Sequence, residues 1–138
     1  MIDNNKKEFN RWFSQAKHDF KVAKDNLDLK NYDWVCFQSQ QSTEKALKAF
    51  LFLKGERGLI THSIFNLLNF CKKIEPDFSK LSKIKKLDQY YIAARYPNGL
   101  PDNIPHEYYL REDAEECLNY AGQTISLIEK LTKQLKDL

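Results

Sequence analysis

Two segments of the chain set an arginine and a histidine near one another. The first runs from Arg57 to His62, and the second combines Arg95 with His106. Arginine binds phosphate through charge-assisted hydrogen bonds, and histidine accepts or donates a proton near neutral pH. Both segments therefore indicate phosphate chemistry. In the second, His106 would transfer a proton and Arg95 would stabilise the charge that develops on a phosphodiester.

The first segment lies just before a predicted short helix that Thr61 or Ser63 would cap. A helix N-terminus offers free backbone N–H groups to an anion, and Arg57 and His62 would add hydrogen-bond donors there. The simpler interpretation is that Thr61 and Ser63 only cap the helix, while His62 packs on its neighbours. The sequence alone leaves both interpretations open.

The second segment includes a predicted loop over residues 96–110, which contains three prolines and an Asn-Gly turn pair. Loops of this length in compact domains are often functional. Tyr96 and Tyr109 would offer aromatic rings to a ligand. In the simpler interpretation, Arg95 bonds carbonyls and carboxylates, and the tyrosines cover one end of the fold.

Five helical segments are predicted to position these residues, because apolar side chains recur in them at steps of three and four. They run from Asn4 to Leu29, Tyr32 to Lys54, Ile64 to Lys73, about Asp77 to Arg95, and Glu112 to Lys136. Asn31 is expected to cap the second helix and Gly55 to end it. The pattern predicts no strand. We therefore expect an all-α, up-and-down bundle of four long helices plus a short extra helix.

Length and composition narrow the class of protein. A chain of 138 residues with 42% hydrophobic and 30% charged residues is typical of one globular domain, here residues 1–138. A net charge of +3 is too even to indicate bulk coating of nucleic acid. Cys36, Cys71 and Cys117 have no metal-site spacing and are predicted to be buried free thiols. We expect a cytoplasmic protein that has no membrane segment, metal or cofactor.

Three motifs follow one another in a fixed order, and together they resemble one family. They are Gln41-Ser-Thr-Glu44-Lys45-Ala-Leu-Lys48-Ala, Thr61-His62-Ser63 and Arg95-Tyr96-Pro97. Over nearly the whole chain they look like HEPN (higher eukaryotes and prokaryotes nucleotide-binding) domains. The resemblance implies a helical bundle that forms a homodimer. It also implies a minimal nucleotidyltransferase as the partner in a toxin–antitoxin-like pair.

Many HEPN domains are metal-independent ribonucleases, in which an arginine is followed closely by a histidine at the start of the last helix. This sequence departs from that signature, because ten residues lie between Arg95 and His106. Four residues lie between Arg57 and His62, but this pair precedes the third helix. Ribonuclease activity, with Arg95 on the scissile phosphate and His106 as the proton-transfer group, therefore stays an alternative.

The leading hypothesis is a non-catalytic HEPN module whose binding partner is a nucleotide, an RNA or a minimal nucleotidyltransferase. Its predicted binding residues are Glu44, Lys45, Arg57, His62, Tyr96 and Tyr109. A third hypothesis is a helical adaptor without a ligand. It would be favoured if Arg95 and the tyrosines were buried and satisfied by one another.

Overall fold

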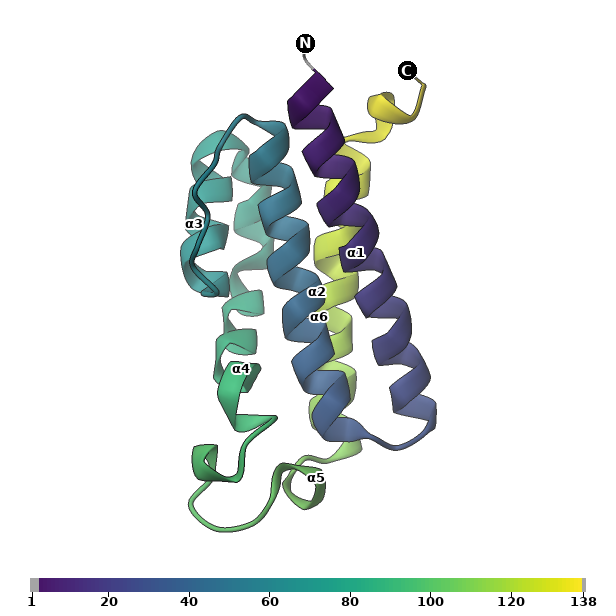
Figure 1. Ribbon diagram of the computed structural model, residues 1–138, viewed down its shortest axis with the longest axis vertical. Coiled ribbons are helices and arrows are strands. Elements are labelled where there is room, and N and C mark those ends of the chain that lie inside the picture. Colours follow the sequence, from purple (N-terminus) through teal and green to yellow (C-terminus); the bar gives the residue numbers. More distant parts are fainter. Residues whose placement is uncertain (1–2, 138) are drawn as a thin grey trace.

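The computed structural model describes residues 3–137, which are helical throughout apart from turns and loops (Figure 1). The α-helices are α1 (Asp3–Asp28), α2 (Tyr32–Leu53), α3 (Ile64–Ile74), α4 (Tyr90–Ala93), α5 (Pro105–Tyr108) and α6 (Arg111–Leu131). The 3₁₀ helices are η1 (Pro76–Gln89), η2 (Pro97–Gly99) and η3 (Lys133–Asp137). No strand occurs within residues 3–137. The predicted all-α helical bundle is confirmed.

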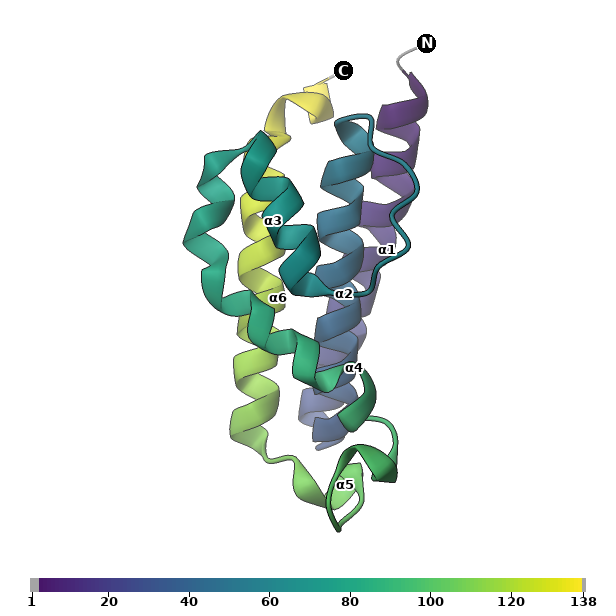
Figure 2. The same cartoon turned by 90° about the vertical axis from the view of Figure 1, so that its left-hand side faces the viewer.

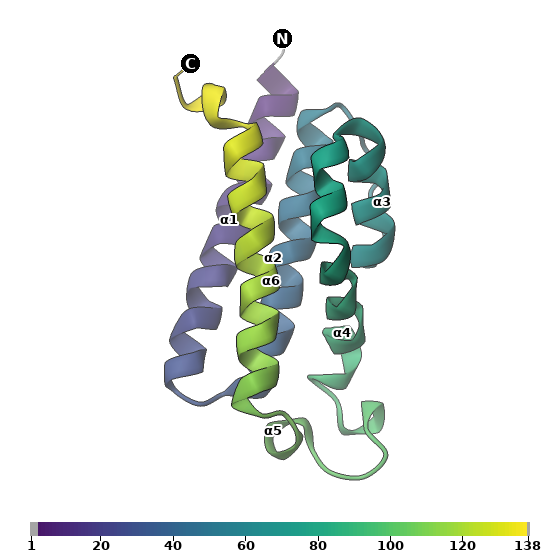
Figure 3. The same cartoon turned by 180° about the vertical axis from the view of Figure 1, so that it is seen from behind.

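Helix α2 lies at the centre of the bundle. It contacts α1, α3, α4, α5 and α6, and α1 and α6 run beside it along the long axis (Figures 1 and 3). Its buried residues include apolar ones such as Leu47 and polar ones such as Gln40, Glu44 and Lys48. A helix surrounded on most sides buries more than one apolar stripe, which explains why polar side chains of α2 are buried together with apolar ones.

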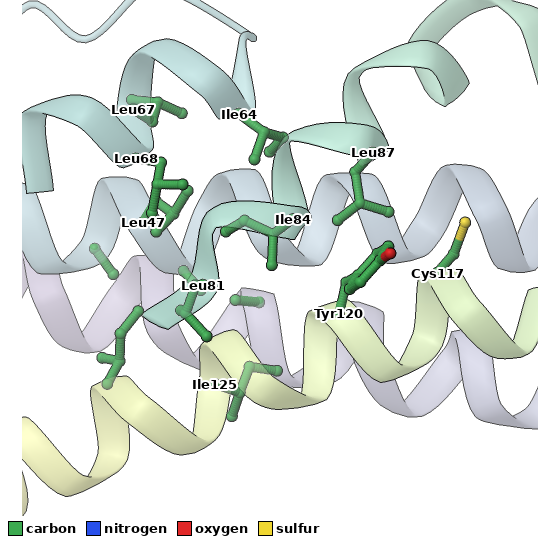
Figure 4. Close-up of a cluster of buried hydrophobic side chains, with 14 of the residues drawn as sticks. Leu47, Ile64, Leu67, Leu68, Leu81, Ile84, Leu87, Cys117, Tyr120 and Ile125 are labelled. Atoms are coloured by element: carbon green, nitrogen blue, oxygen red, sulfur yellow. The ribbon is translucent and has the colours of Figure 1, made fainter. Parts of the chain in front are cut away.

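The hydrophobic core joins α1, α2, α3, η1 and α6. Figure 4 shows the side chains that meet there, among them Leu47, Ile64, Leu68, Leu81, Ile84 and Ile125. All three cysteines are buried and free, as the sequence predicts. Burial raises the pKa of the Cys71 thiol, which keeps that group in its neutral form.

The segment predicted as the fourth long α-helix is mostly a 3₁₀ helix. It has a kink at Leu81, where φ is −102° and ψ is 26°. Its buried residues Phe78, Leu81, Ile84 and Leu87 recur every third position. Three residues per turn is the repeat of a 3₁₀ helix, so this spacing keeps all four on one side. The short helix α4 follows and ends two residues before Arg95.

The capping role predicted for Asn31 is wrong. Its side chain makes no capping bond to α2; instead its amide donates to Oδ1 of Asn26 at 3.0 Å. The last α-helix is also shorter than expected, since α6 ends at Leu131. Thr132 bonds back through its hydroxyl to the carbonyl of Ile128 at 2.7 Å.

A strap of residues 54–63 leaves the end of α2 and runs back along the bundle to the start of α3 (Figure 2). Gly55 and Gly58 have φ values of 94° and 72°, which side-chain-bearing residues rarely adopt. Arg57 donates to the carbonyl of Phe52 at 3.2 Å and to Oδ1 of Asn5 on α1 at 3.0 Å. The strap is therefore fixed at its beginning, and His62 lies at its far end.

Candidate functional site

His62 lies against a buried carboxylate. Its Nδ1 is 3.1 Å from Oε2 of Glu44. Glu44 is 5% exposed, whereas 55% of the His62 side chain is exposed. Because an ionised carboxylate only accepts hydrogen bonds, the proton of a neutral His62 ring belongs on Nδ1. Nε2 is then left as the acceptor of the ring.

Glu44 is held in place by two further residues of α2. Lys48 donates from Nζ to Oε2 at 3.0 Å, and Gln40 donates from Nε2 to Oε1 at 3.3 Å. Gln40 also lies 3.4 Å from the backbone carbonyl of His62. Buried ion pairs add little net stability compared with apolar side chains. Positioning of His62 is therefore the clearer consequence of this network.

Tyr91 connects His62 with Arg95. The rings of His62 and Tyr91 stack with centroids 4.9 Å apart and planes 18° apart. The Arg95 guanidinium carbon lies 5.0 Å from the Tyr91 centroid and 4.3 Å from that of Phe37. It also lies 5.3 Å from the ring of Tyr96, and Arg95 Nε donates to the Tyr91 carbonyl at 2.9 Å. We call these residues, together with Glu44, the His62–Arg95 site.

The Arg95 guanidinium is held by aromatic rings rather than by an acid. Among the residues that the structure describes, no carboxylate forms an ion pair with Arg95, and its hydrogen bond to Tyr91 uses only Nε. Cation–π contacts hold a guanidinium without consuming its donors. The two terminal nitrogens of Arg95 therefore stay available to an anion.

The start of α3 already carries an acidic side chain. Asp88 accepts hydrogen bonds from the backbone N–H groups of Ile64 at 2.6 Å and Phe65 at 3.0 Å. Ser63 caps the same helix, because its Oγ accepts from the N–H of Asn66 at 3.1 Å. A phosphate at these N–H groups would have to displace Asp88. The capping interpretation is thus confirmed for Ser63, and the same bonds fix the backbone next to His62.

His106 lies in a different setting, on α5. Its Nδ1 is 3.5 Å from Oδ1 of Asp33, in the first turn of α2. That oxygen is buried and makes no hydrogen bond within the described part of the chain. In residues 4–135, no hydrogen bond, ion pair or ring contact joins His106 to Arg95. Tyr91 therefore connects His62 with Arg95, and the contact of His106 is with Asp33.

Three other predicted residues make contacts outside the His62–Arg95 site. Lys45 forms an ion pair with Asp19 on α1. Arg57 fixes the strap, and its guanidinium lies 5.3 Å from the Phe52 ring. Tyr109 is buried against Tyr90, with ring centroids 5.6 Å apart. Burial raises the pKa of the Tyr109 phenol to about 12.

Sequence reasoning missed three residues that form or support the site: Phe37, Gln40 and Tyr91. Two of them carry a signal that was available. Tyr91 precedes Arg95 by four residues and Gln40 precedes Glu44 by four, which is the spacing of neighbours on one helix face. Phe37 approaches Arg95 from another helix, and helical spacing does not reveal such a contact.

Among the described residues, no group of three or more histidine, cysteine, aspartate or glutamate side chains is placed to hold a metal ion. Within residues 3–137, none of the helices has the length and apolar character needed to cross a membrane.

Known proteins resemble the chain in both sequence and structure. It is 32% identical over 132 residues to a Methanocaldococcus jannaschii protein named "Putative toxin MJ1304", covering 89% of this chain and 87% of that protein. The crystal structure of TT1696 from Thermus thermophilus superposes with a TM-score of 0.79 at 34% identity, covering 88% of this chain and 96% of that one. ST0689, an archaeal HEPN homologue, gives a TM-score of 0.72 at 32% identity, with coverages of 89% and 96%.

The family model described as the HEPN domain matches residues 9–131, a range that includes α2, the strap, Arg95 and all of α6. The helical architecture agrees with that of the solved relatives. This chain belongs to the HEPN domain family.

Proposed function

We propose that this HEPN domain binds a nucleotide at the His62–Arg95 site. The observation that carries the proposal is the Arg95 guanidinium, which rests on the rings of Phe37 and Tyr91 with its terminal nitrogens unpaired among the described residues. A guanidinium in this state suits bidentate binding of a phosphate group. The ring of Tyr96, 52% exposed, is suited to stack on a base.

The biological setting that we propose is a toxin–antitoxin-like pair in the cytoplasm. The similarity to the protein named "Putative toxin MJ1304" supports a toxin-like role. The family resemblance supports a homodimer with a minimal nucleotidyltransferase as its partner. Light scattering of the protein, alone and mixed with the product of a neighbouring gene, tests both assemblies. A monomer that does not bind that product would contradict this part of the proposal.

Titration calorimetry with AMP, ATP and GTP tests nucleotide binding. The variant Arg95→Ala should weaken binding by about 10-fold or more, because hydrogen bonds to charged groups contribute about 1.5–3 kcal/mol. Arg111→Ala is the matched control, since Arg111 is an exposed arginine paired with Glu115 at 3.2 Å. Equal affinities for Arg95→Ala and the wild type, or no binding of any of the three nucleotides, would reject the proposal.

A metal-independent ribonuclease is the second candidate. It is favoured by the same free guanidinium, which could hold a scissile phosphate. With His106 as the proton-transfer group, this candidate is tested by the cleavage of RNA in the presence of EDTA. The wild type is compared with Arg95→Ala and His106→Ala. If Arg95→Ala cleaves as fast as the wild type, the candidate fails.

A further inference from the structure

The ribonuclease candidate requires a proton-transfer group beside Arg95, and the contacts of the site supply one. We infer that His62, positioned by Glu44, is that group, and that it acts on the 2′-hydroxyl of an RNA nucleotide whose phosphate is bound by Arg95. This inference rests on the ribonuclease candidate. It reassigns the proton transfer from His106 to a residue of the strap.

The orientation of His62 fits general base catalysis. A carboxylate bound to one ring nitrogen selects the tautomer and leaves the other nitrogen to react. Glu44 Oε2 lies 3.1 Å from Nδ1 of His62, so Nε2 is the reactive atom. Since more than half of the side chain is exposed, a substrate can reach it.

Glu44 itself is well suited to position the ring. It is buried and bonded to both Lys48 and Gln40, so its carboxylate has little freedom to turn. Lys48 also compensates the charge of the Glu44 carboxylate. Glu44 therefore has a cationic partner even when the His62 ring is neutral and carries a proton on Nδ1 alone. Gln40 adds a contact to the carbonyl of His62, which holds the backbone as well as the ring.

Tyr91 limits the distance between the two reacting groups. The His62 ring centroid and the Arg95 guanidinium carbon lie 4.9 Å and 5.0 Å from the centroid of the Tyr91 ring, so they are at most about 10 Å apart. With a hydrogen bond at each end, a single nucleotide spans such a distance, with its ribose at His62 and its 3′-phosphate at Arg95. His106 instead lies against Asp33, with its Nδ1 3.5 Å from Oδ1 of that residue.

The proposed reaction is an internal transesterification. Nε2 of His62 accepts the proton of the 2′-hydroxyl, and the 2′-oxygen forms a bond to phosphorus. The bond from phosphorus to the 5′-oxygen of the next nucleotide breaks, and that oxygen takes a proton from water. The resulting hydroxide removes the proton from His62, which restores the neutral ring. Arg95 stabilises the charge on the non-bridging oxygens throughout, and the products end in a 2′,3′-cyclic phosphate and a 5′-hydroxyl.

The test uses the full-length protein and a labelled single-stranded RNA of mixed sequence in EDTA, with the same sequence in DNA as a second probe. His62→Ala should lower the cleavage rate by about 100-fold or more, as removal of a general base does. Its affinity for AMP should fall far less than its rate. Added imidazole should restore part of the activity. His18→Ala, a change at an exposed histidine of α1, is the matched control and should cleave at the wild-type rate.

The contribution of Glu44 needs a separate variant, because removing one partner of a buried ion pair can unfold the protein. The double variant Glu44→Gln/Lys48→Gln removes both charges. It should lower the rate by about 10-fold or more. The loss should fall on kcat, with little change in the KM for RNA, because Glu44 acts through His62 and does not itself contact the substrate. An unchanged kcat would overturn the positioning role.

The outcomes separate this inference from the functions on which it rests. Wild-type cleavage by His62→Ala, or loss of cleavage in His106→Ala alone, would overturn the role of His62 while leaving a ribonuclease. Absence of RNA cleavage by the wild type would overturn both the ribonuclease candidate and this inference. Nucleotide binding that depends on Arg95 would still stand in that case. Cleavage of the DNA probe would also overturn the inference about His62, since DNA has no 2′-hydroxyl.

Discussion

The strap and the loop of residues 96–110 each bring a histidine to a carboxylate of α2. His62 of the strap lies 3.1 Å from Glu44, and His106 of the loop lies 3.5 Å from Asp33. Both acids are buried and both histidines are exposed. The two pairs differ in what else the acid contacts. Glu44 has two further donors, whereas Oδ1 of Asp33 makes no hydrogen bond in the described residues.

This difference shows how one helix can support a rigid site and a looser contact. A fully satisfied polar network fixes the groups that belong to it, whereas a single long contact does not. The strap is also held at both ends, by Arg57 at its start and by Asp88 at the first turn of α3. The loop carries His106 on a helix of only four residues. The comparison therefore favours His62 over His106 as the precisely positioned histidine.

Glu44→Gln and Asp33→Asn give the largest expected contrast. Glu44→Gln leaves the buried Lys48 ammonium without an acid, so the free energy of unfolding should fall by about 3–5 kcal/mol. Asp33→Asn removes a charge whose Oδ1 has no described hydrogen-bond partner. It should cost less than about 1 kcal/mol, including the lost interaction with the N-terminus of α2.

Urea denaturation followed by circular dichroism measures both values under the same conditions. The wild type and Gln15→Ala, a change on the exposed surface of α1, serve as references. Losses of equal size in Glu44→Gln and Asp33→Asn would show that the two carboxylates are equally well satisfied. The contrast between the strap and the loop would then be wrong.

Much of the fold could be predicted because helical periodicity is a local property of the sequence. α1 and α2 begin and end within one residue of the predicted bounds. The main error concerns η1, where apolar residues recur every three positions and were interpreted as an α-helix. The two periods differ little over four apolar residues, so only the regular step of three from Phe78 to Leu87 could have distinguished them.

The candidate site was harder to predict because its contacts join distant parts of the chain. Glu44, His62 and Arg95 were each identified from residue type or family resemblance. Their convergence depends on Tyr91 and on the path of the strap. The pairing of Arg95 with His106 used proximity along the sequence, but a loop can carry neighbours in sequence to different partners. Here it brings His106 to Asp33.

Asp88→Ala and Asp113→Ala compare the two helix starts that adjoin the histidine-bearing segments. Asp88 caps α3 next to the strap, and Asp113 accepts from the N–H of Leu110 at 2.9 Å at the start of α6. Each change should lower the free energy of unfolding by about 1–2 kcal/mol, the usual cost of a lost cap. Only Asp88→Ala should also weaken nucleotide binding, because it frees the backbone beside His62.

Urea denaturation and calorimetric titration with AMP measure the two effects separately. Asp88→Asn is the control, since its amide oxygen can still accept one of the two N–H bonds and should restore part of both. Equal loss of AMP affinity in Asp88→Ala and Asp113→Ala would contradict a special role for the strap.

The smallest expected effect concerns the buried and exposed tyrosines of the loop. Burial raises the pKa of the Tyr109 phenol to about 12, whereas the phenol of an unfolded chain has a pKa of about 10. As pH rises between these values, the unfolded chain releases a proton that the folded protein keeps, so the free energy of unfolding falls. Tyr109→Phe should remove about 1 kcal/mol of this loss at pH 11 relative to pH 8. Tyr96→Phe, a change at an exposed tyrosine, should keep the wild-type loss of unfolding free energy between pH 8 and pH 11. Urea denaturation at pH 8 and at pH 11 measures this loss. If Tyr109→Phe and Tyr96→Phe lost the same free energy of unfolding between the two pH values, the Tyr109 phenol would ionise as readily in the folded protein as in the unfolded chain. Water would then reach the inner side of the loop.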